Sequence, residues 1–244
     1  MDQPVALITG GAKGIGRGIA LDLAARHWRI ALCYRTSEAE ANATAEDIMA
    51  RGGRSLAIRC DVSDPVATKN LVAQVEQEWG RIDVLINGAG PYHRINLFDE
   101  TVEGWNEMFD GNLHPIFYLA QAVAPGMKTR KAGRIINFSM ANADQMEAQP
   151  DVTGHYIAKA GVLILTRTLA KLLAPYGITV NAISPGFIDS GSAPPQELAA
   201  MTKRIPAGYI GTIDDTVAAV RYLLSEEARY VNGANIQISG GWGI

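Results

Sequence analysis

Short apolar runs alternate with longer stretches of helical period along the 244 residues, and this alternation constrains the fold most strongly. The runs span residues 5–9, 30–34, 55–59, 84–86, 134–138, 179–183 and 235–238. Their apolar character is nearly continuous, as in strands that helices cover on both faces of a parallel sheet. The sequence therefore predicts an α/β fold, in which residues 1–244 form a single doubly wound domain of the Rossmann type.

Charge and cysteine content exclude several classes of protein. The chain has 22 Lys plus Arg against 25 Asp plus Glu, a balance that disfavours nucleic acid or an anionic membrane as partner. Cys33 and Cys60 lie in apolar runs, without the spacing of a disulfide framework or a metal site. The sequence has neither a signal-peptide pattern nor eighteen consecutive apolar residues. We expect a cytoplasmic protein without a metal ion.

Local signals mark where several helices begin and where one is interrupted. Three starts carry capping signals: Ser37 with Glu40, Thr212 with Asp215, and Asp64 before Pro65. Pro115 lies within a long helical pattern, where it cannot donate to the carbonyl of Gly111 and its ring clashes there. The sequence therefore predicts a kink beside Asn112.

A glycine-rich segment, TGGAKGIG at 9–16, follows the first predicted strand. Its glycines Gly10, Gly14 and Gly16, with Ile15 between the last two, open a helix that we expect to run to about residue 27. Such glycines let the backbone turn tightly and approach a pyrophosphate, whose charge the helix N-terminus favours. A purely structural loop is the alternative, but the flanking strand and helix favour dinucleotide binding.

The end of the second predicted strand indicates which dinucleotide binds. NAD-specific sites place an acidic residue there to bind the ribose 2′-hydroxyl, whereas this chain reads Tyr34, Arg35, Thr36 and Ser37. Arg35 can contact a 2′-phosphate with two N–H groups, Lys13 adds a cation, and the hydroxyls of Thr36 and Ser37 can donate. The alternative is that Arg35 and Lys13 are ordinary solvated cations on the surface, without a ligand. We expect NADP(H) rather than NAD(H).

The order of the motifs points to a family. The motifs are, in order, TGGAKGIG at 9–16, CDVSD at 60–64, NGAG at 87–90, Asn112, Lys159 and SPGFIDS at 184–190. With these motifs, the chain resembles the short-chain dehydrogenase/reductase family over essentially its whole length. It looks most like the 3-oxoacyl-acyl-carrier-protein reductases, in KAG at 159–161, GITVNAISPGF at 177–187 and VNGANIQISGG at 231–241. The resemblance implies a seven-stranded parallel sheet of order 3-2-1-4-5-6-7 and a homotetramer.

The same resemblance implies further cofactor-binding residues. They are Asp61 and Val62 beside the adenine; Asn87, Gly88, Ala89 and Gly90 supporting the cofactor; Lys159 at the ribose; and Pro185, Gly186 and Ile188 against the nicotinamide.

The catalytic pattern of the family is incomplete in this chain. In the family a Tyr phenol protonates the carbonyl, a Lys four residues later lowers the phenol pKa, and a Ser positions the carbonyl. Lys159 fits, but His155 stands four residues before it and Tyr156 three. Met140 occupies the Ser position, with Ser139 one residue earlier, and Ser139 could serve only if the strand ends in a bulge or has already turned.

Three accounts of the proton donor follow. In the first, which we adopt as the prediction, a 3₁₀ turn opens the helix and places Tyr156 over Lys159, assisted by a water on a backbone carbonyl freed at the kink near Asn112. In the second, His155 is the donor, although the charge of Lys159 would lower its pKa. In the third, the chain binds a nucleotide with weak or no reductase activity.

The sequence thus predicts an NADP(H)-dependent carbonyl reductase that acts on a small-molecule or thioester substrate, such as a carrier-bound 3-oxoacyl group. A pteridine reductase is an alternative, because such relatives replace the Ser with an Asp and Asp144 stands nearby, out of register. The segment before His155 also offers Asn142 and Thr153 as replacement polar groups.

Overall fold

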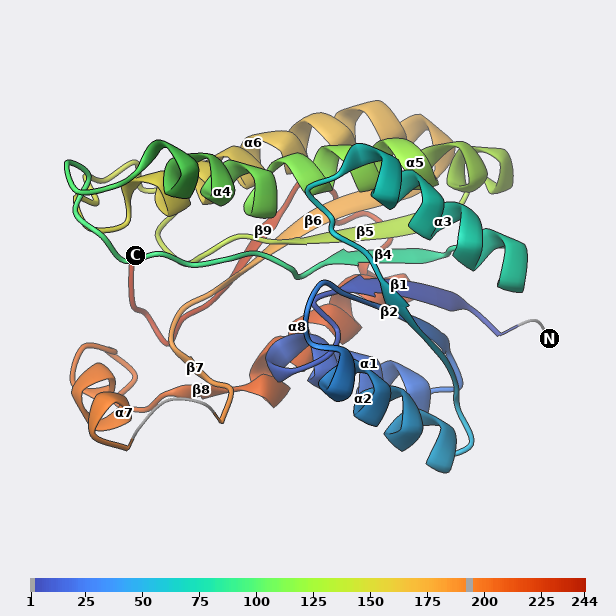
Figure 1. The fold of residues 1–244 in the computed structure, drawn as a ribbon, viewed down its shortest axis with the longest axis horizontal. Coiled ribbons are helices and arrows are strands. Elements are labelled where there is room, and N and C mark those ends of the chain that lie inside the picture. Colours follow the sequence, from blue (N-terminus) through green and yellow to red (C-terminus); the bar gives the residue numbers. More distant parts are fainter. Residues whose placement is uncertain (1–2, 192–194) are drawn as a thin grey trace.

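A parallel sheet of seven strands forms the centre of the molecule (Figure 1). The computed structural model describes residues 3–191 and 195–244. The strand order is β3-β2-β1-β4-β5-β6-β9, and every neighbouring pair is parallel. Because β9 is the last strand of this sheet along the chain, the predicted order is confirmed, and so is the single α/β domain of the Rossmann type.

The strands of the sheet begin and end within two residues of the predicted bounds. They are β1 (Val5–Thr9), β2 (Arg29–Tyr34), β3 (Arg54–Arg59), β4 (Val84–Asn87), β5 (Gly133–Phe138), β6 (Ile178–Pro185) and β9 (Asn235–Ile238). A second, two-stranded sheet pairs β7 (Ile188–Asp189) with β8 (Gly211–Thr212). It was not predicted, because strands of two residues leave no periodic pattern in a sequence.

Helices cover both faces of the central sheet (Figure 1). On one face lie α1 (Gly14–Ala25), α2 (Glu38–Ala50) and α8 (Ile213–Leu224). On the other lie α3 (Pro65–Trp79), α4 (Val102–Asn112), α5 (His114–Arg130) and α6 (Thr153–Leu173). Near β7 and β8 lies α7 (Pro195–Thr202), and 3₁₀ turns at Ala174–Tyr176 and Glu226–Ala228 follow α6 and α8.

Alternate residues of β1 explain why two cores form. Val5 and Leu7 pack into the core beneath α3 and α5, whereas Ala6 and Ile8 pack into the core beneath α1 and α8. Successive strand residues point to opposite faces, so a continuous apolar run fills both layers at once.

The predicted capping signals are confirmed for two helices and wrong in part for a third. Thr212 and Asp215 form a reciprocal capping box at α8, and Asp64 accepts a hydrogen bond from the Val66 N–H at 2.7 Å at the start of α3. Ser37 does precede α2, but its side chain makes no cap bond, so the expected box with Glu40 does not form.

The helical pattern around Pro115 is broken as predicted. Helix α4 ends at Asn112 and α5 begins at His114. The Ile116 N–H donates to the Leu113 carbonyl at 3.2 Å, a shorter-range bond than the α-helical one. Within the described residues, no helix has the length and apolar character that crossing a membrane requires.

Candidate nucleotide-binding and catalytic site

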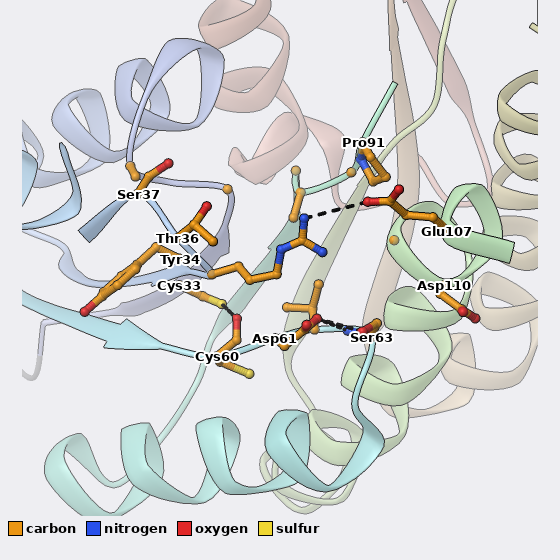
Figure 2. A pocket seen from close by; sticks show the side chains of 18 of the residues that line it. Cys33, Tyr34, Thr36, Ser37, Cys60, Asp61, Ser63, Pro91, Glu107 and Asp110 are labelled. Carbon is orange, nitrogen blue, oxygen red and sulfur yellow. Dashed lines mark hydrogen bonds and ion pairs between the residues drawn. The ribbon is translucent and has the colours of Figure 1, made fainter. Parts of the chain in front are cut away.

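A cleft of about 710 Å³ opens at the carboxyl ends of β1 to β4. Ligands of open α/β sheets bind at this edge. Ten of the predicted cofactor-binding residues line the cleft, several of which are labelled in Figure 2: Gly10, Lys13, Arg35, Thr36, Ser37, Asp61, Val62, Gly88, Ala89 and Gly90.

The glycine-rich loop brings the backbone close to the floor of the cleft. Gly10 and Gly14 have φ of +69° and +55°, values that favour glycine. A Cβ on Gly16 would collide with the carbonyl oxygen of Gly10. Gly14, Ile15 and Gly16 form the first turn of α1 behind the loop. The N-terminus of that helix, with its free N–H groups, therefore fits a pyrophosphate, which is the group that the loop was predicted to hold.

Hydrogen bonds from β1 and β5 fix the end of β4 and the loop that follows it. The Thr9 hydroxyl accepts from the N–H groups of Gly88 at 3.1 Å and Ala89 at 3.2 Å, which ties this loop to β1. The Asn87 amide donates to the Asn137 side-chain oxygen at 2.8 Å, so its side chain braces β4 against β5. Asn87 thus supports the cleft from behind.

Asp61 is held as a carboxylate at the end of β3. Its side chain accepts hydrogen bonds from the Ser63 N–H at 3.0 Å and the Ser63 hydroxyl at 2.7 Å. Burial by itself would raise the pKa of Asp61, but the Ser63 hydrogen bonds and the charge of Arg35 lower it below its usual range. This acceptor suits the exocyclic amine of an adenine, the role that the resemblance implies.

The opposite wall of the cleft was missed by the sequence analysis. Helix α4 contributes the acidic and polar side chains of Glu103, Asn106, Glu107 and Asp110. Figure 2 labels Glu107 and Asp110. Glu103, Glu107 and Asp110 follow the spacing of one helix face, so a helical charge pattern could have revealed the wall. The remaining lining residues are Ala12, Cys33, Tyr34, Cys60, Ser63, Pro91 and Gly111.

Lys159 lies buried at the carboxyl end of β5. Its Nζ donates to the Phe138 carbonyl at 2.9 Å, and its side chain is 8 % exposed. Burial disfavours the charge and lowers the pKa of Lys159 to about 8. The Lys159 side chain is therefore an ammonium at neutral pH. It gives up its proton more readily than the ammonium of a solvated lysine does.

Tyr156 does not lie over Lys159 in the predicted way. The Tyr156 N–H donates to the Val152 carbonyl at 2.8 Å, an α-helical bond, so the expected 3₁₀ opening is wrong. The Tyr156 hydroxyl donates to the Asn142 carbonyl at 2.8 Å and accepts from the Glu147 N–H at 3.1 Å. Both bonds anchor the 142–147 segment. In the family the tyrosine stands four residues before the lysine, whereas Tyr156 stands three residues before Lys159.

His155 occupies the position four residues before Lys159 and is 8 % exposed. Burial, followed by the nearby charge of Lys159, lowers the pKa of His155 to about 4. The imidazole is therefore neutral at pH 7, and its ring packs nearly perpendicular to that of Tyr92, with centroids 5.0 Å apart. Among the described residues, its Nδ1 atom has no hydrogen-bond partner.

Ser139 could replace the family Ser only if the chain bulges or turns at the end of β5, and its backbone contacts show no bulge. The N–H groups of Ser139 and Ala141 donate to the carbonyls of Ile183 and Pro185, both at 2.9 Å, so the backbone continues in strand register without a bulge. The Ser139 hydroxyl donates to the Lys159 carbonyl at 2.7 Å. It therefore fixes β5 to α6, while Met140 packs against an apolar cluster.

The other candidate polar groups are engaged in part, since Oδ1 of Asn112 and Oδ1 of Asn142 are buried without a hydrogen-bond partner among the described residues. The Asn112 amide donates to the carbonyls of Pro91 and Met108, both at 3.0 Å. Asp144 accepts from the Gln237 amide at 3.0 and 3.1 Å, which directs it toward β9. The Thr153 hydroxyl donates to the Gln149 carbonyl at 2.8 Å, at the start of α6.

The residues predicted to lie against the nicotinamide are at the carboxyl end of β6, and they do not line the cleft described above. Pro185 ends that strand and Ile188 begins β7. A Cβ on Gly186 would stand 3.0 Å from Ser239, which follows β9. These residues and Lys159 thus occupy the neighbouring strand ends, next to the described cleft.

Comparison with known proteins assigns the family. A family model described as enoyl-(acyl carrier protein) reductase matches residues 10–243. The chain is 37 % identical over 239 residues to the 3-oxoacyl-[acyl-carrier-protein] reductase FabG of Staphylococcus aureus strain Mu50, covering 97 % of this chain and 96 % of that protein. It is 33 % identical over 245 residues to the FabG of Escherichia coli K12, covering 97 % and 96 %.

A crystal structure agrees with the sequence comparisons. A putative short-chain alcohol dehydrogenase from Sinorhizobium meliloti 1021 superposes with a TM-score of 0.91 at 29 % identity, covering 99 % of this chain and 97 % of that one. The sheet order of this chain is the one that the family resemblance implies. The chain therefore belongs to the short-chain dehydrogenase/reductase family of oxidoreductases.

Proposed function

We propose that the protein is an NADP(H)-dependent oxidoreductase that reduces a carbonyl to an alcohol by hydride transfer. The observation that carries the proposal is the pair Arg35 and Lys13, which line the cleft beside the glycine-rich loop. A 2′-phosphate is a dianion at neutral pH, and a guanidinium at the end of β2 matches it. The loop geometry supports the same ligand independently, because Gly10 and Gly14 hold the backbone open to a pyrophosphate.

Together these residues would contact such a cofactor along its whole length. The first turn of α1 would hold the pyrophosphate, Arg35 with Lys13, Thr36 and Ser37 the 2′-phosphate, and Asp61 the adenine. The end of β6, from Pro185 to Ile188, would lie against the nicotinamide. When bound in its reduced form, the cofactor supplies the hydride.

For the proton, we propose Lys159 in place of Tyr156. The Tyr156 hydroxyl is bound on both sides by the 142–147 segment, and His155 is neutral at pH 7. Lys159 carries a proton at neutral pH, with a pKa lowered to about 8, near the range that favours proton transfer. Its Nζ–H would pass to the alkoxide oxygen, and the amine would then be reprotonated from solvent. The kink at Pro115, beside Asn112, gives a backbone carbonyl that can hold the relay water.

The substrate class is a 3-oxoacyl thioester, such as one held by a carrier protein. The support is the 37 % identity to a protein named 3-oxoacyl-[acyl-carrier-protein] reductase over nearly the whole chain. A pteridine substrate has less support, since Asp144 is bound to Gln237 and turned toward β9. The cytoplasmic location stays a prediction from the sequence.

We also propose a homotetramer. Apolar side chains that are 44 to 65 % exposed project from α5 and α6: Phe117, Ile157, Ile164 and Leu172. Such side chains suit self-complementary packing between copies related by a two-fold axis.

The activity is tested by following NADPH absorbance with acetoacetyl-CoA, a dihydropterin and a panel of small diketones. We expect consumption of NADPH with acetoacetyl-CoA. Turnover of the dihydropterin alone would contradict the proposed substrate class. Tight NADPH binding without turnover of any compound would contradict the proposal that the protein is a reductase.

A further inference from the structure

We propose that Glu107 competes with the 2′-phosphate of the cofactor for Arg35, and so sets how strongly the cleft prefers NADPH. The proposal rests on the proposed NADP(H) dependence. It assigns to α4 a part in cofactor choice.

The two side chains meet from opposite walls of the cleft. Arg35 follows β2 and Glu107 lies in α4, and both line the cavity. The Arg35 guanidinium is 3.8 Å from Oε1 of Glu107, an ion pair that a dashed line marks in Figure 2. The cation expected to bind the 2′-phosphate is therefore held across the cleft by a carboxylate of the protein.

A bound 2′-phosphate and Glu107 require the same guanidinium. The phosphate offers two negative charges and three acceptor oxygens, so it replaces the carboxylate as the partner. The Arg35–Glu107 ion pair then has to break, which lowers the affinity for NADPH. NADH presents a neutral hydroxyl at this position and gains little from Arg35, so the affinity for NADH depends less on Glu107.

His93 allows Glu107 to release Arg35 without becoming isolated. The Nε2 atom of His93 lies 3.3 Å from Oε2 of Glu107, the carboxylate oxygen that Arg35 does not face. The carboxylate thus keeps a neighbour that can donate a hydrogen bond after Arg35 turns to a phosphate. The side chains of Arg35 and Glu107 are 56 % and 39 % exposed, so the ion pair is weak enough to exchange.

The central test compares Glu107→Gln with the matched variant Glu103→Gln. Glu103 lies on the same wall of the cleft, one helical turn from Glu107, and the structure gives it no contact with Arg35. Titration of the full chain should show that Glu107→Gln tightens NADPH binding about two- to fivefold, the scale of an exposed ion pair. NADH affinity should change less. Glu103→Gln removes the same charge without breaking an ion pair to Arg35, so it should tighten NADPH binding by less than Glu107→Gln does.

A double-mutant cycle separates competition from general repulsion. In an Arg35→Ala background, Glu107→Gln should no longer tighten NADPH binding, because the pair is already broken. Tightening by Glu107→Gln that persists in full in this background, or that Glu103→Gln reproduces in full, would overturn the proposal. Thermal unfolding of each variant confirms that the fold is kept.

The same titrations distinguish this proposal from the proposed cofactor. Equal affinities of the unmutated protein for NADPH and NADH would contradict the NADP(H) dependence and the competition together. A preference for NADPH that Glu107→Gln leaves unchanged would contradict the competition alone.

Discussion

The hydroxyl of Tyr156 donates to the Asn142 carbonyl at 2.8 Å, whereas the Nζ of Lys159 donates to the Phe138 carbonyl at 2.9 Å. The two groups that cooperate in the family mechanism are thus bound to different parts of the backbone. His155 rather than Tyr156 occupies the position four residues before Lys159, so the tyrosine side chain leaves α6 one position later, about 100° further round the helix axis. The proposed proton transfer therefore depends on Lys159.

Tyr156→Phe should therefore destabilise the protein without abolishing turnover. The variant leaves the Glu147 N–H and the Asn142 carbonyl without their partner, at a cost of about 1–3 kcal/mol in the free energy of unfolding. Urea unfolding measures the loss, and kcat should stay within about threefold of the unmutated value, far from the factor of 10² typical for loss of a general acid. A hundredfold loss of kcat in a folded variant would restore Tyr156 as the proton donor.

Lys159→Met should lower kcat by about 10² or more, the scale for loss of a general acid. Lys171→Met is the matched control, since Lys171 lies in the same helix and is exposed. Steady-state kinetics with acetoacetyl-CoA measures both. Lys159→Met with nearly full activity would move the proton donor to another residue.

The rate should also fall as the pH rises. Reduction consumes the Lys159 ammonium, whose pKa is lowered to about 8 by burial, so the active form is lost above that pH. The pH profile of kcat/KM for carbonyl reduction should show a descending limb near pH 8. A profile that is flat to pH 10 would contradict the assignment.

His155 should make the protein sensitive to mild acid. Its pKa is about 4 in the folded state against about 6.5 unfolded, so the unfolded state takes up the proton first as the pH falls. Stability should decline between pH 6.5 and 4, by at most about 3 kcal/mol. Unfolding curves of His155→Gln should show a weaker decline, and those of His114→Gln, at an exposed site, should follow the unmutated protein. An equal decline in both variants would refute the prediction.

Ile164→Asp should dissociate the proposed homotetramer, because it places a charge at an apolar position of α6 that is 65 % exposed. Light scattering should give a smaller particle for the variant than for the unmutated protein. An unmutated protein that is monomeric at micromolar concentration would contradict the tetramer itself.

The fold was predictable because its signals are local. Continuous apolar runs define the strands, and Asp64, Thr212 and Pro115 mark helix starts and a break that the structure confirms. The places of Gly10 and Arg35 in the cleft were also predictable, because Gly10 lies in the glycine-rich motif and Arg35 directly follows the second strand.

The catalytic end was less predictable, because it depends on contacts between distant segments. No pattern shows that the Tyr156 hydroxyl binds the Asn142 carbonyl, or that the Ser139 hydroxyl binds the Lys159 carbonyl. The expected 3₁₀ turn failed for a local reason: the Tyr156 N–H donates to the Val152 carbonyl, so the helix opens with a regular α turn. Glu107 was missed because its partner Arg35 is 72 residues away in the sequence.

The most direct test of the account is the rate of acetoacetyl-CoA reduction by the unmutated protein and by Arg35→Asp, each with NADPH and with NADH. The account predicts one 3-hydroxyacyl product per NADPH oxidised, with kcat/KM for NADPH at least about tenfold above that for NADH, and a reversed order in Arg35→Asp. Equal use of both cofactors by the unmutated protein, or binding of NADPH without any substrate-dependent oxidation, would contradict it.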